Sequence, residues 1–176
     1  MIRGMIGDMS TNHRPYRDLT DAALLDDTNL RLLSELQHDA RLSLAELGRR
    51  VGLSAPAVAE RLQRLERDGV IRAYRAEIDP AAVGYGLSAI IRVRPAPMQL
   101  HKIADLARAT PEVVECHRIT GEDCYLIKAH VGSMGHLEEL LDQLASFGQT
   151  TTSIIQSSPV AARGIELGRK RGLSAA

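Results

Sequence analysis

The 176-residue sequence predicts an α+β protein in which an N-terminal winged helix-turn-helix is followed by a βαββαβ ferredoxin-like sandwich. Two observations lead to this prediction. Residues 25–69 carry three apolar repeats of helical period, and only Gly52-Leu53 separates the second from the third. From residue 87 onward, β-rich runs alternate with further helical patterns. A hydrophobic content of 44% is sufficient for the cores that such units require.

Capping residues define the three N-terminal helices. The first follows the acidic pair Asp26-Asp27, which suits the positive end of a helix. The second begins with the capping box of Ser43 and Glu46 and ends at Gly52, and the third begins at Ser54. Their apolar positions recur at helical spacing and comprise Leu25, Leu32, Leu33 and Leu36, then Leu44, Leu47 and Val51, then Val58, Leu62 and Leu65.

A turn as short as Gly52-Leu53 forces its two helices to cross steeply, which is the helix-turn-helix geometry. The third helix, ending near Asp68-Gly69, is therefore the candidate reading helix. After it, Val70-Ile71 and residues 73–78 have the composition of short strands, so we expect a wing there, closed by Asp79-Pro80.

The charge distribution favours a nucleic-acid partner although the formal net charge is zero. Residues 41–75 contain eight basic and four acidic residues. All eight are arginines, whose guanidinium groups fork onto phosphate oxygens and guanine edges. A solvated helix surface is the alternative explanation for the same residues, which are Arg41, Arg49, Arg50, Arg61, Arg64, Arg67, Arg72 and Arg75.

The second unit is expected to contain strands over residues 87–94, 113–120, 124–131 and 150–157. One helix, with Leu100, Ile103, Ala104 and Ala107 on one face, follows the first strand, and a second, capped by Ser133, follows the third. The apolar face of that second helix comprises Leu137, Leu140, Leu141 and Leu144. This order gives a sheet with both helices on one face.

The other face of the sheet is predicted to be open. In the third strand Tyr125, Ile127, Ala129 and Val131 should meet the helices, which leaves Cys124, Leu126, Lys128 and His130 on the open face. Leu126, with Ile90 or Ile91 and one of Ile154 or Ile155, makes that face apolar enough that we expect a partner subunit to cover it.

Several other classes of protein find no support. Cys116 and Cys124 form neither a disulfide framework nor a closed zinc site, and the histidines at 101, 117, 130 and 136 lack the spacing of metal ligands. We therefore expect no metal, no cofactor and a reducing cytoplasm. Neither a signal peptide nor a run of membrane-spanning length is evident, so no membrane partner is expected.

The sequence resembles the Lrp/AsnC (feast/famine) regulators over about residues 25–160. The resemblance continues into the sandwich, where Thr120-Gly121 precedes a Tyr-Leu-Ile strand. The residues that carry it are Leu25-Asp26, Leu32-Leu33, Leu47-Gly48-Arg49-Arg50-Val51-Gly52-Leu53-Ser54, Val58, Arg61-Leu62, Arg64-Leu65-Glu66, Gly69-Val70-Ile71 and Val113-Val114-Glu115-Cys116-His117.

The resemblance implies a transcription regulator that binds double-stranded DNA, forms a homodimer that often assembles to an octamer, and responds to an amino acid. The implied organisation is a flexible leader (1–23), a DNA-binding domain (24–79), a linker (80–86), an effector-binding and oligomerisation domain (87–160) and a tail (161–176). Met5 or Met9 can serve as the start as well as Met1. The sequence departs from the family at two positions. Asn29 lies where the family often has Asp, which we interpret as affecting local capping. Cys124 lies where the effector loop of the family more often has Asp, and here Asp123 comes one residue earlier.

The candidate DNA contacts lie at the start of the third helix and on the wing. Small residues there allow close approach to the groove, while Arg61 and Arg64 can meet phosphates or guanine edges. Arg72 and Arg75 are expected to touch phosphates only. The complete set is Ser54, Ala55, Pro56, Ala57, Glu60, Arg61, Arg64, Arg72 and Arg75.

The resemblance also places an effector at the second hairpin, where an ordinary turn is the alternative explanation. A carboxylate can accept the ammonium group of an amino acid, and amide and hydroxyl donors can hold its carboxylate. The candidate residues are Ile119, Thr120, Gly121, Asp123 and Cys124, with Thr150, Thr152 and Met134 nearby.

Two alternative functions remain open at the level of sequence. Enzymes that decarboxylate siroheme resemble the same two-domain architecture and use histidines on a haem-like substrate. A nucleoid-architectural protein without an effector would instead bind DNA with weak sequence preference and would ignore small molecules.

Overall fold

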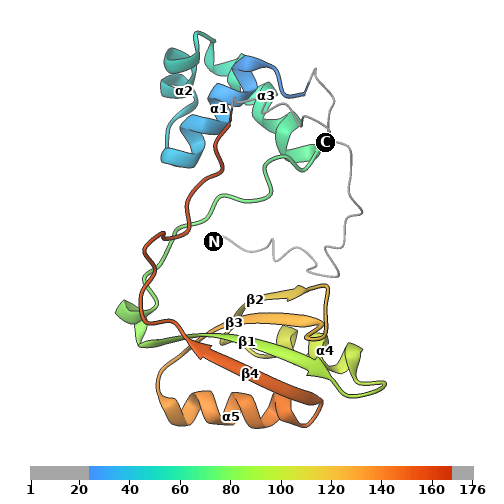
Figure 1. Ribbon diagram of the computed structural model, residues 1–176. Coiled ribbons are helices and arrows are strands. Elements are labelled where there is room, and N and C mark those ends of the chain that lie inside the picture. Colours follow the sequence, from blue (N-terminus) through green and yellow to red (C-terminus); the bar gives the residue numbers. More distant parts are fainter. Residues whose placement is uncertain (1–23, 168–176) are drawn as a thin grey trace, which may run out of the picture. The chain divides into compact units, whose positions relative to one another are not determined.

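The computed structural model describes residues 24–167, which fall into two compact units (Figure 1). One contains residues 24–75 together with 163–167, and the other contains residues 76–162. The expected leader and residues 168–176 of the expected tail lie outside the described residues. The segment expected as a linker belongs to the second unit, where it includes the 3₁₀ turn Ala81–Val83.

Three helices form the first unit: α1 (Asp27–His38), α2 (Leu44–Val51) and α3 (Ala55–Arg67). Each begins at a side-chain cap that the sequence predicted. Asp26 accepts from the amide of Asn29, Ser43 from that of Glu46, and Ser54 from that of Ala57. These caps satisfy backbone donors that a helix N-terminus otherwise leaves without partners. The helices pack around Leu24, Leu32, Leu47, Val51, Val58, Leu62 and Leu65.

The turn between α2 and α3 depends on two glycines. Gly52 ends α2 in the left-handed region, with φ of 78°, which favours glycine. Gly48 lies one turn earlier, and a Cβ built on it would come within 2.3 Å of the carbonyl oxygen of Leu53. The Leu53 amide in turn donates to the Gly48 carbonyl at 2.8 Å. The chain can therefore fold back closely onto α2 only because position 48 has no side chain.

The predicted strands of the wing are wrong. Residues 72–79 belong to no strand, because no segment among the described residues 24–167 supplies a backbone ladder for them. Tyr74 is 46% exposed, and its hydroxyl donates to Glu66 at 2.8 Å. This bond and burial together raise the pKa of Tyr74 to about 12, with burial the larger cause. The segment is thus tied to α3 by a side chain and not by a strand ladder.

The second unit has the predicted βαββαβ order: β1 (Leu87–Pro95), α4 (Leu100–Ala109), β2 (Val113–Arg118), β3 (Tyr125–Val131), α5 (Met134–Ala145) and β4 (Gly148–Ile154). The antiparallel sheet has strand order β2-β3-β1-β4 (Figure 1). Its core joins the inner face of the sheet to both helices and includes Ile91, Ile103, Ile127, Leu137 and Leu144. The predicted inward set of β3, Tyr125, Ile127, Ala129 and Val131, is buried at 3% exposure or less.

The last strand begins and ends earlier than predicted. Gly148 opens β4 opposite Pro95 of β1, and a Cβ on it would lie 2.2 Å from the carbonyl oxygen of Arg94. A glycine is therefore required where the two strands first meet. The strand ends at Ile154, although Ile155 still donates its amide to the Ser88 carbonyl at 2.8 Å.

The open face of the sheet is more polar than predicted. Alternation along β1 puts Ile90 on it and buries Ile91, and Ile155 shares it because Ile154 pairs with the inward residue Ala89. Around Ile90 and Leu126, Lys128 contacts Glu115 at 3.4 Å and Ser88 lies 2.7 Å from Nδ1 of His130. Coverage of this mixed face by a partner subunit stays a prediction.

After β4 the chain returns to the helix-turn-helix unit (Figure 1). The side-chain amide of Gln37 on α1 donates to the Ile165 carbonyl at 3.1 Å. A Cβ on Gly164 would meet the same glutamine side chain at 2.5 Å. Within the described residues, no helix is long and apolar enough to cross a membrane.

Candidate nucleic-acid interface and effector region

Helix α3 presents a solvent-exposed face along its length. Val58, Leu62 and Leu65 are buried at 8% exposure or less, which turns the opposite side of the helix outward. Pro56, in the first turn, gives the helix a fixed start. Of the predicted contacts, Ser54, Pro56, Glu60 and Arg64 are exposed, while Ala55 and Ala57 are half-buried. These residues are brought together on one accessible surface.

Gln63 and Arg67 lie on the same exposed face and were not predicted. Helical spacing from Glu60 and Arg64 would have found them, because residues three apart share a face. Glutamine can bind adenine through two hydrogen bonds, so Gln63 widens the range of base edges that this surface can recognise.

Arg61 departs from the prediction. Its Nη1 donates to Oδ2 of Asp26 at 2.7 Å and to Oδ1 of Asn29 at 3.0 Å, and both partners belong to the start of α1. The guanidinium is therefore held between two helices, and Arg61 is not one of the exposed residues of α3. The reason is that Arg61 lies on the flank of α3 that faces Asp26 and Asn29 at the start of α1.

The expected role of Asn29 in local capping is also wrong. The residue is 2% exposed, and besides accepting from Arg61 its side chain donates to the Leu24 carbonyl at 2.9 Å. The cap of α1 is supplied by Asp26, whose Oδ1 accepts the Asn29 amide at 2.7 Å. Asn29 is thus a buried bridge between α1, the chain before it and α3.

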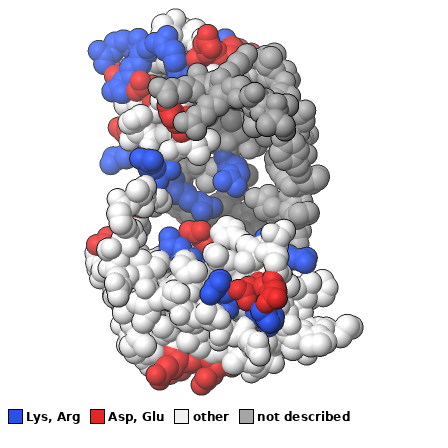
Figure 2. Space-filling model, viewed as in Figure 1, with Lys and Arg blue, Asp and Glu red and all other residues white. Residues whose placement is uncertain are grey.

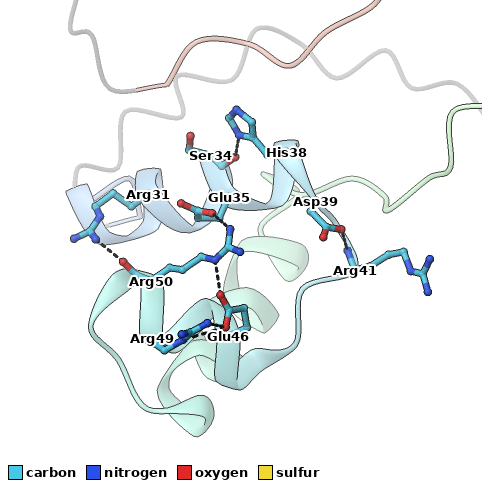
Figure 3. A network of polar contacts seen from close by, with 9 residues as sticks. All are labelled: Arg31, Ser34, Glu35, His38, Asp39, Arg41, Glu46, Arg49 and Arg50. Atoms are coloured by element: carbon cyan, nitrogen blue, oxygen red, sulfur yellow. Dashed lines mark hydrogen bonds and ion pairs between the residues drawn. The ribbon is translucent and has the colours of Figure 1, made fainter.

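The arginines of residues 41–75 divide into paired and unpaired groups. Arg50 contacts Glu35 of α1 and Glu46 of α2, both at 2.7 Å, and Arg49 also contacts Glu46 (Figure 3). Figure 2 shows Lys and Arg side chains, with acidic ones among them, at the end of this unit that carries α2. Hydrogen bonds from Arg50 and Arg49 hold the pKa of Glu46 below its ordinary value. Arg49 and Arg50 are therefore partly neutralised.

The unpaired group consists of arginines that have no ion pair within the described residues 24–167: Arg41, Arg64, Arg67, Arg72 and Arg75. All five are exposed. Arg64 and Arg67 belong to α3, while Arg72 and Arg75 lie on the extended segment that follows it. Their charges are available to an anionic ligand such as the DNA backbone.

The predicted effector loop connects β2 to β3 at one end of the sheet. Gly121 has a φ of 104° and open space around it, as the tip of the hairpin requires. Asp123 contacts Arg92 of β1 at 3.4 Å, and Arg94 of the same strand contacts Glu122. The loop is therefore rich in charge, with Ile119 and Thr120 exposed beside it and the Cys124 thiol 3.8 Å from the Glu122 carbonyl.

Arg92 and Arg94 were missed at the level of sequence. The period of two along β1 places them on the open face, but their neighbourhood with residues 122–123 follows only from the pairing of β1 with β3. Such a cross-strand neighbour is invisible in a single segment of sequence.

The other predicted effector residues lie elsewhere in the chain. Thr150 pairs with Val93 and Thr152 with Ile91, so both face the helix side of the sheet on edge strand β4, two strands away from β3. Met134 begins α5 directly after β3 ends, which places it at the end of the sheet opposite the loop. Within one chain, the expected proximity of Met134 to the loop is wrong, because β3 separates them.

The comparisons with known proteins agree with this geometry. An AsnC-type helix-turn-helix domain matches residues 25–66, and an Lrp/AsnC ligand binding domain matches residues 88–165. The chain belongs to the Lrp/AsnC family. Its fold class is the one predicted, and the protein is a DNA-binding transcriptional regulator of this family.

Three relatives show how far the Lrp/AsnC similarity extends. The transcriptional regulator LrpC of Bacillus subtilis is 33% identical over 133 residues, covering 76% of this chain and 92% of that protein, and its structure matches with a TM-score of 0.75. The leucine-responsive regulatory protein of Escherichia coli is 33% identical, covering 77% of this chain and 80% of its own. A regulator from Neisseria meningitidis, solved as a complex with L-Met, matches at a TM-score of 0.76 and 32% identity, covering 81% and 96% of the two chains.

Proposed function

We propose that this Lrp/AsnC regulator acts in the cytoplasm as a homodimer, able to assemble to an octamer, and controls transcription by inserting α3 into the major groove without catalysing a reaction. The observation that carries the proposal is the exposed face of α3, on which Arg64 and Arg67 have no ion-pair partner within the described chain. Ser54, Ala55, Pro56, Ala57, Glu60 and Gln63 complete the reading surface, and Arg72 and Arg75 contact phosphates.

The test of DNA reading compares Arg64→Ala with the full-length parent on the protein's own upstream DNA. We expect operator affinity to fall about tenfold, because a charged contact worth about 1–3 kcal/mol is lost. Replacing Arg49, which is paired with Glu46, is the matched control and should leave affinity nearly unchanged. Equal operator affinities for Arg64→Ala and the parent would contradict the proposal that α3 contacts the DNA.

We propose that the effector is an amino acid bound at residues 119–124. Asp123 and Glu122 can accept its ammonium group, and the Gly121 amide, the Thr120 hydroxyl and Arg92 can donate to its carboxylate. Met134 lies beyond the far end of β3 in one chain, so it would join the site from a second copy, and Thr150 and Thr152 on β4 complete the proposed set. The L-Met complex of the Neisseria regulator supports this class of ligand.

A thermal-shift screen against the twenty amino acids tests the effector site. We expect at least one amino acid to raise the melting temperature of the parent and to lose that effect in Gly121→Thr, because a β-branched residue is strained at a φ of 104°. Light scattering on the same samples shows whether the variant still assembles. A normal ligand response in Gly121→Thr would exclude the loop, and weak, ligand-insensitive DNA binding by the parent would favour an architectural protein instead.

A further inference from the structure

A cluster of three polar side chains joins the start of α1 to the middle of α3. Asp26 and Asn29 accept hydrogen bonds from the same nitrogen, Nη1 of Arg61, at 2.7 and 3.0 Å. The cluster lies away from the exposed face of α3, so none of its members is needed for direct contact with bases. What it does is therefore a separate question from how α3 binds DNA.

The cluster is closely connected internally. One oxygen of Asp26 accepts the Asn29 amide at 2.7 Å while the other accepts from Arg61. In the side chain of Asn29, Oδ1 accepts from Arg61 and Nδ2 donates to the Leu24 carbonyl at 2.9 Å. Because Asn29 is 2% exposed, water cannot replace either bond. The position of the Arg61 guanidinium is consequently fixed against the first turn of α1.

Such a link constrains rotation in a way that the apolar core does not. Leucine and valine contacts are non-directional and tolerate small rotations of a helix, whereas hydrogen bonds lose strength within tenths of an ångström. A rotation of roughly 20° would move groups at the outer radius of α3 by about 2 Å. Such a shift is enough to break the paired hydrogen bonds by which a side chain recognises a base.

We infer that Asp26, Asn29 and Arg61 are positioning residues that fix the rotation of α3 and thereby set which of its exposed side chains reach base edges. The inference rests on α3 being the reading helix. It concerns discrimination between sequences more than total affinity, because phosphate contacts tolerate displacements that base contacts do not.

The experiment uses two full-length variants at one buried position. Asn29→Leu keeps a similar volume but removes both hydrogen bonds, whereas Asn29→Asp keeps the acceptor for Arg61 and removes the donor to Leu24. Affinities for the operator and for a scrambled duplex are measured across a salt series, and melting temperatures are measured in parallel.

We expect Asn29→Leu to lower the ratio of operator affinity to scrambled affinity about tenfold while the slope of affinity against salt stays unchanged. Asn29→Asp should retain the parental ratio within about twofold even if its melting temperature falls. A role limited to stability would make the ratio follow the melting temperature in both variants, which would overturn the inference. If Asn29→Leu does not fold, Arg61→Met, which keeps an unbranched side chain but donates to neither acceptor, replaces it with the same expectation for the ratio of affinities.

Two further arginine variants separate this inference from the proposed function. Arg50→Gln breaks an interhelical ion pair that does not involve α3, and it should leave the ratio unchanged. Arg64→Gln should lower operator affinity whatever the role of the cluster. If Arg64→Gln has no effect, the assignment of α3 as reading helix fails. If Arg64→Gln weakens binding but Asn29→Leu keeps the parental ratio, only the positioning role fails.

Discussion

The helix-turn-helix unit and the sandwich unit place their candidate binding residues in opposite ways. In the first, the exposed residues from Ser54 to Arg67 follow one another along a single helix. In the second, residues 119–124, Thr150 and Met134 are distributed over both ends of a sheet. A helix presents residues that are close in the sequence on one surface, whereas a sheet brings together residues that are distant in the sequence.

The largest expected effect breaks the helix-turn-helix unit alone. Gly48→Ala places a methyl group against the Leu53 carbonyl, which must move, and we expect a loss of about 3 kcal/mol of unfolding free energy. DNA binding should disappear while assembly and ligand response remain. Calorimetry on the full-length variant measures the loss of unfolding free energy, and light scattering measures assembly. A loss of assembly would contradict the expectation that only the helix-turn-helix unit is affected.

The matching change in the sandwich is Gly148→Ala, which brings a methyl group against the Arg94 carbonyl where β1 meets β4. We expect a loss of about 2 kcal/mol, because an edge strand can shift more easily than a packed turn. Assembly or ligand response should weaken, and intrinsic binding of a single DNA half-site should persist. Unchanged oligomer size and ligand response would show that β4 tolerates the displacement and takes no part in either.

The sequence alone predicts those elements whose signals lie close together in the chain. Caps such as Ser43 and Ser54, together with apolar spacing, predict the helices because the signals lie within one segment. The alternation from Tyr125 to Val131 predicts the inner face of β3 for the same reason. The prediction of strands in the wing was wrong because the strand propensity of a segment does not supply a neighbouring segment to pair with.

The errors within the sites have two causes. Arg61 and Asn29 are 32 positions apart in the chain, and nothing in either segment announces that they meet. The contact between Arg92 and Asp123 likewise depends on strand register. Long-range pairing decides these two cases, and local patterns carry no information about it. The place of Met134 is different, because the predicted strand over residues 124–131 already separates it from residues 119–123.

The smallest expected effect is a pH dependence confined to the sandwich. Burial and the nearby Lys128 charge hold the pKa of His130 below its ordinary value of 6.5, although Glu115 opposes them. The folded state therefore binds this proton less readily than the unfolded chain. The contribution of His130 to the stability of the folded state is fully present above pH 6.5 and is lost as the pH falls from there through the lowered folded-state pKa.

Substitution tests this dependence directly. In His130→Asn, the melting temperature should fall less between pH 7 and pH 5 than in the parent, while His101→Asn, an exposed change on α4, should leave the parental slope. Identical slopes in the parent and His130→Asn would show that His130 does not contribute.

The return of the chain from β4 to α1 also governs how the protein can be taken apart. The backbone crosses between the units once near Arg75 and again near Ala162, so the helix-turn-helix unit is built from two separate stretches of the chain. A protease that cuts near Arg75 leaves residues 163–167 on the sandwich fragment, and only non-covalent contacts such as the Gln37–Ile165 hydrogen bond then hold them to α1. A clone that stops at Arg75 would lack the carbonyl of Ile165 that Gln37 binds.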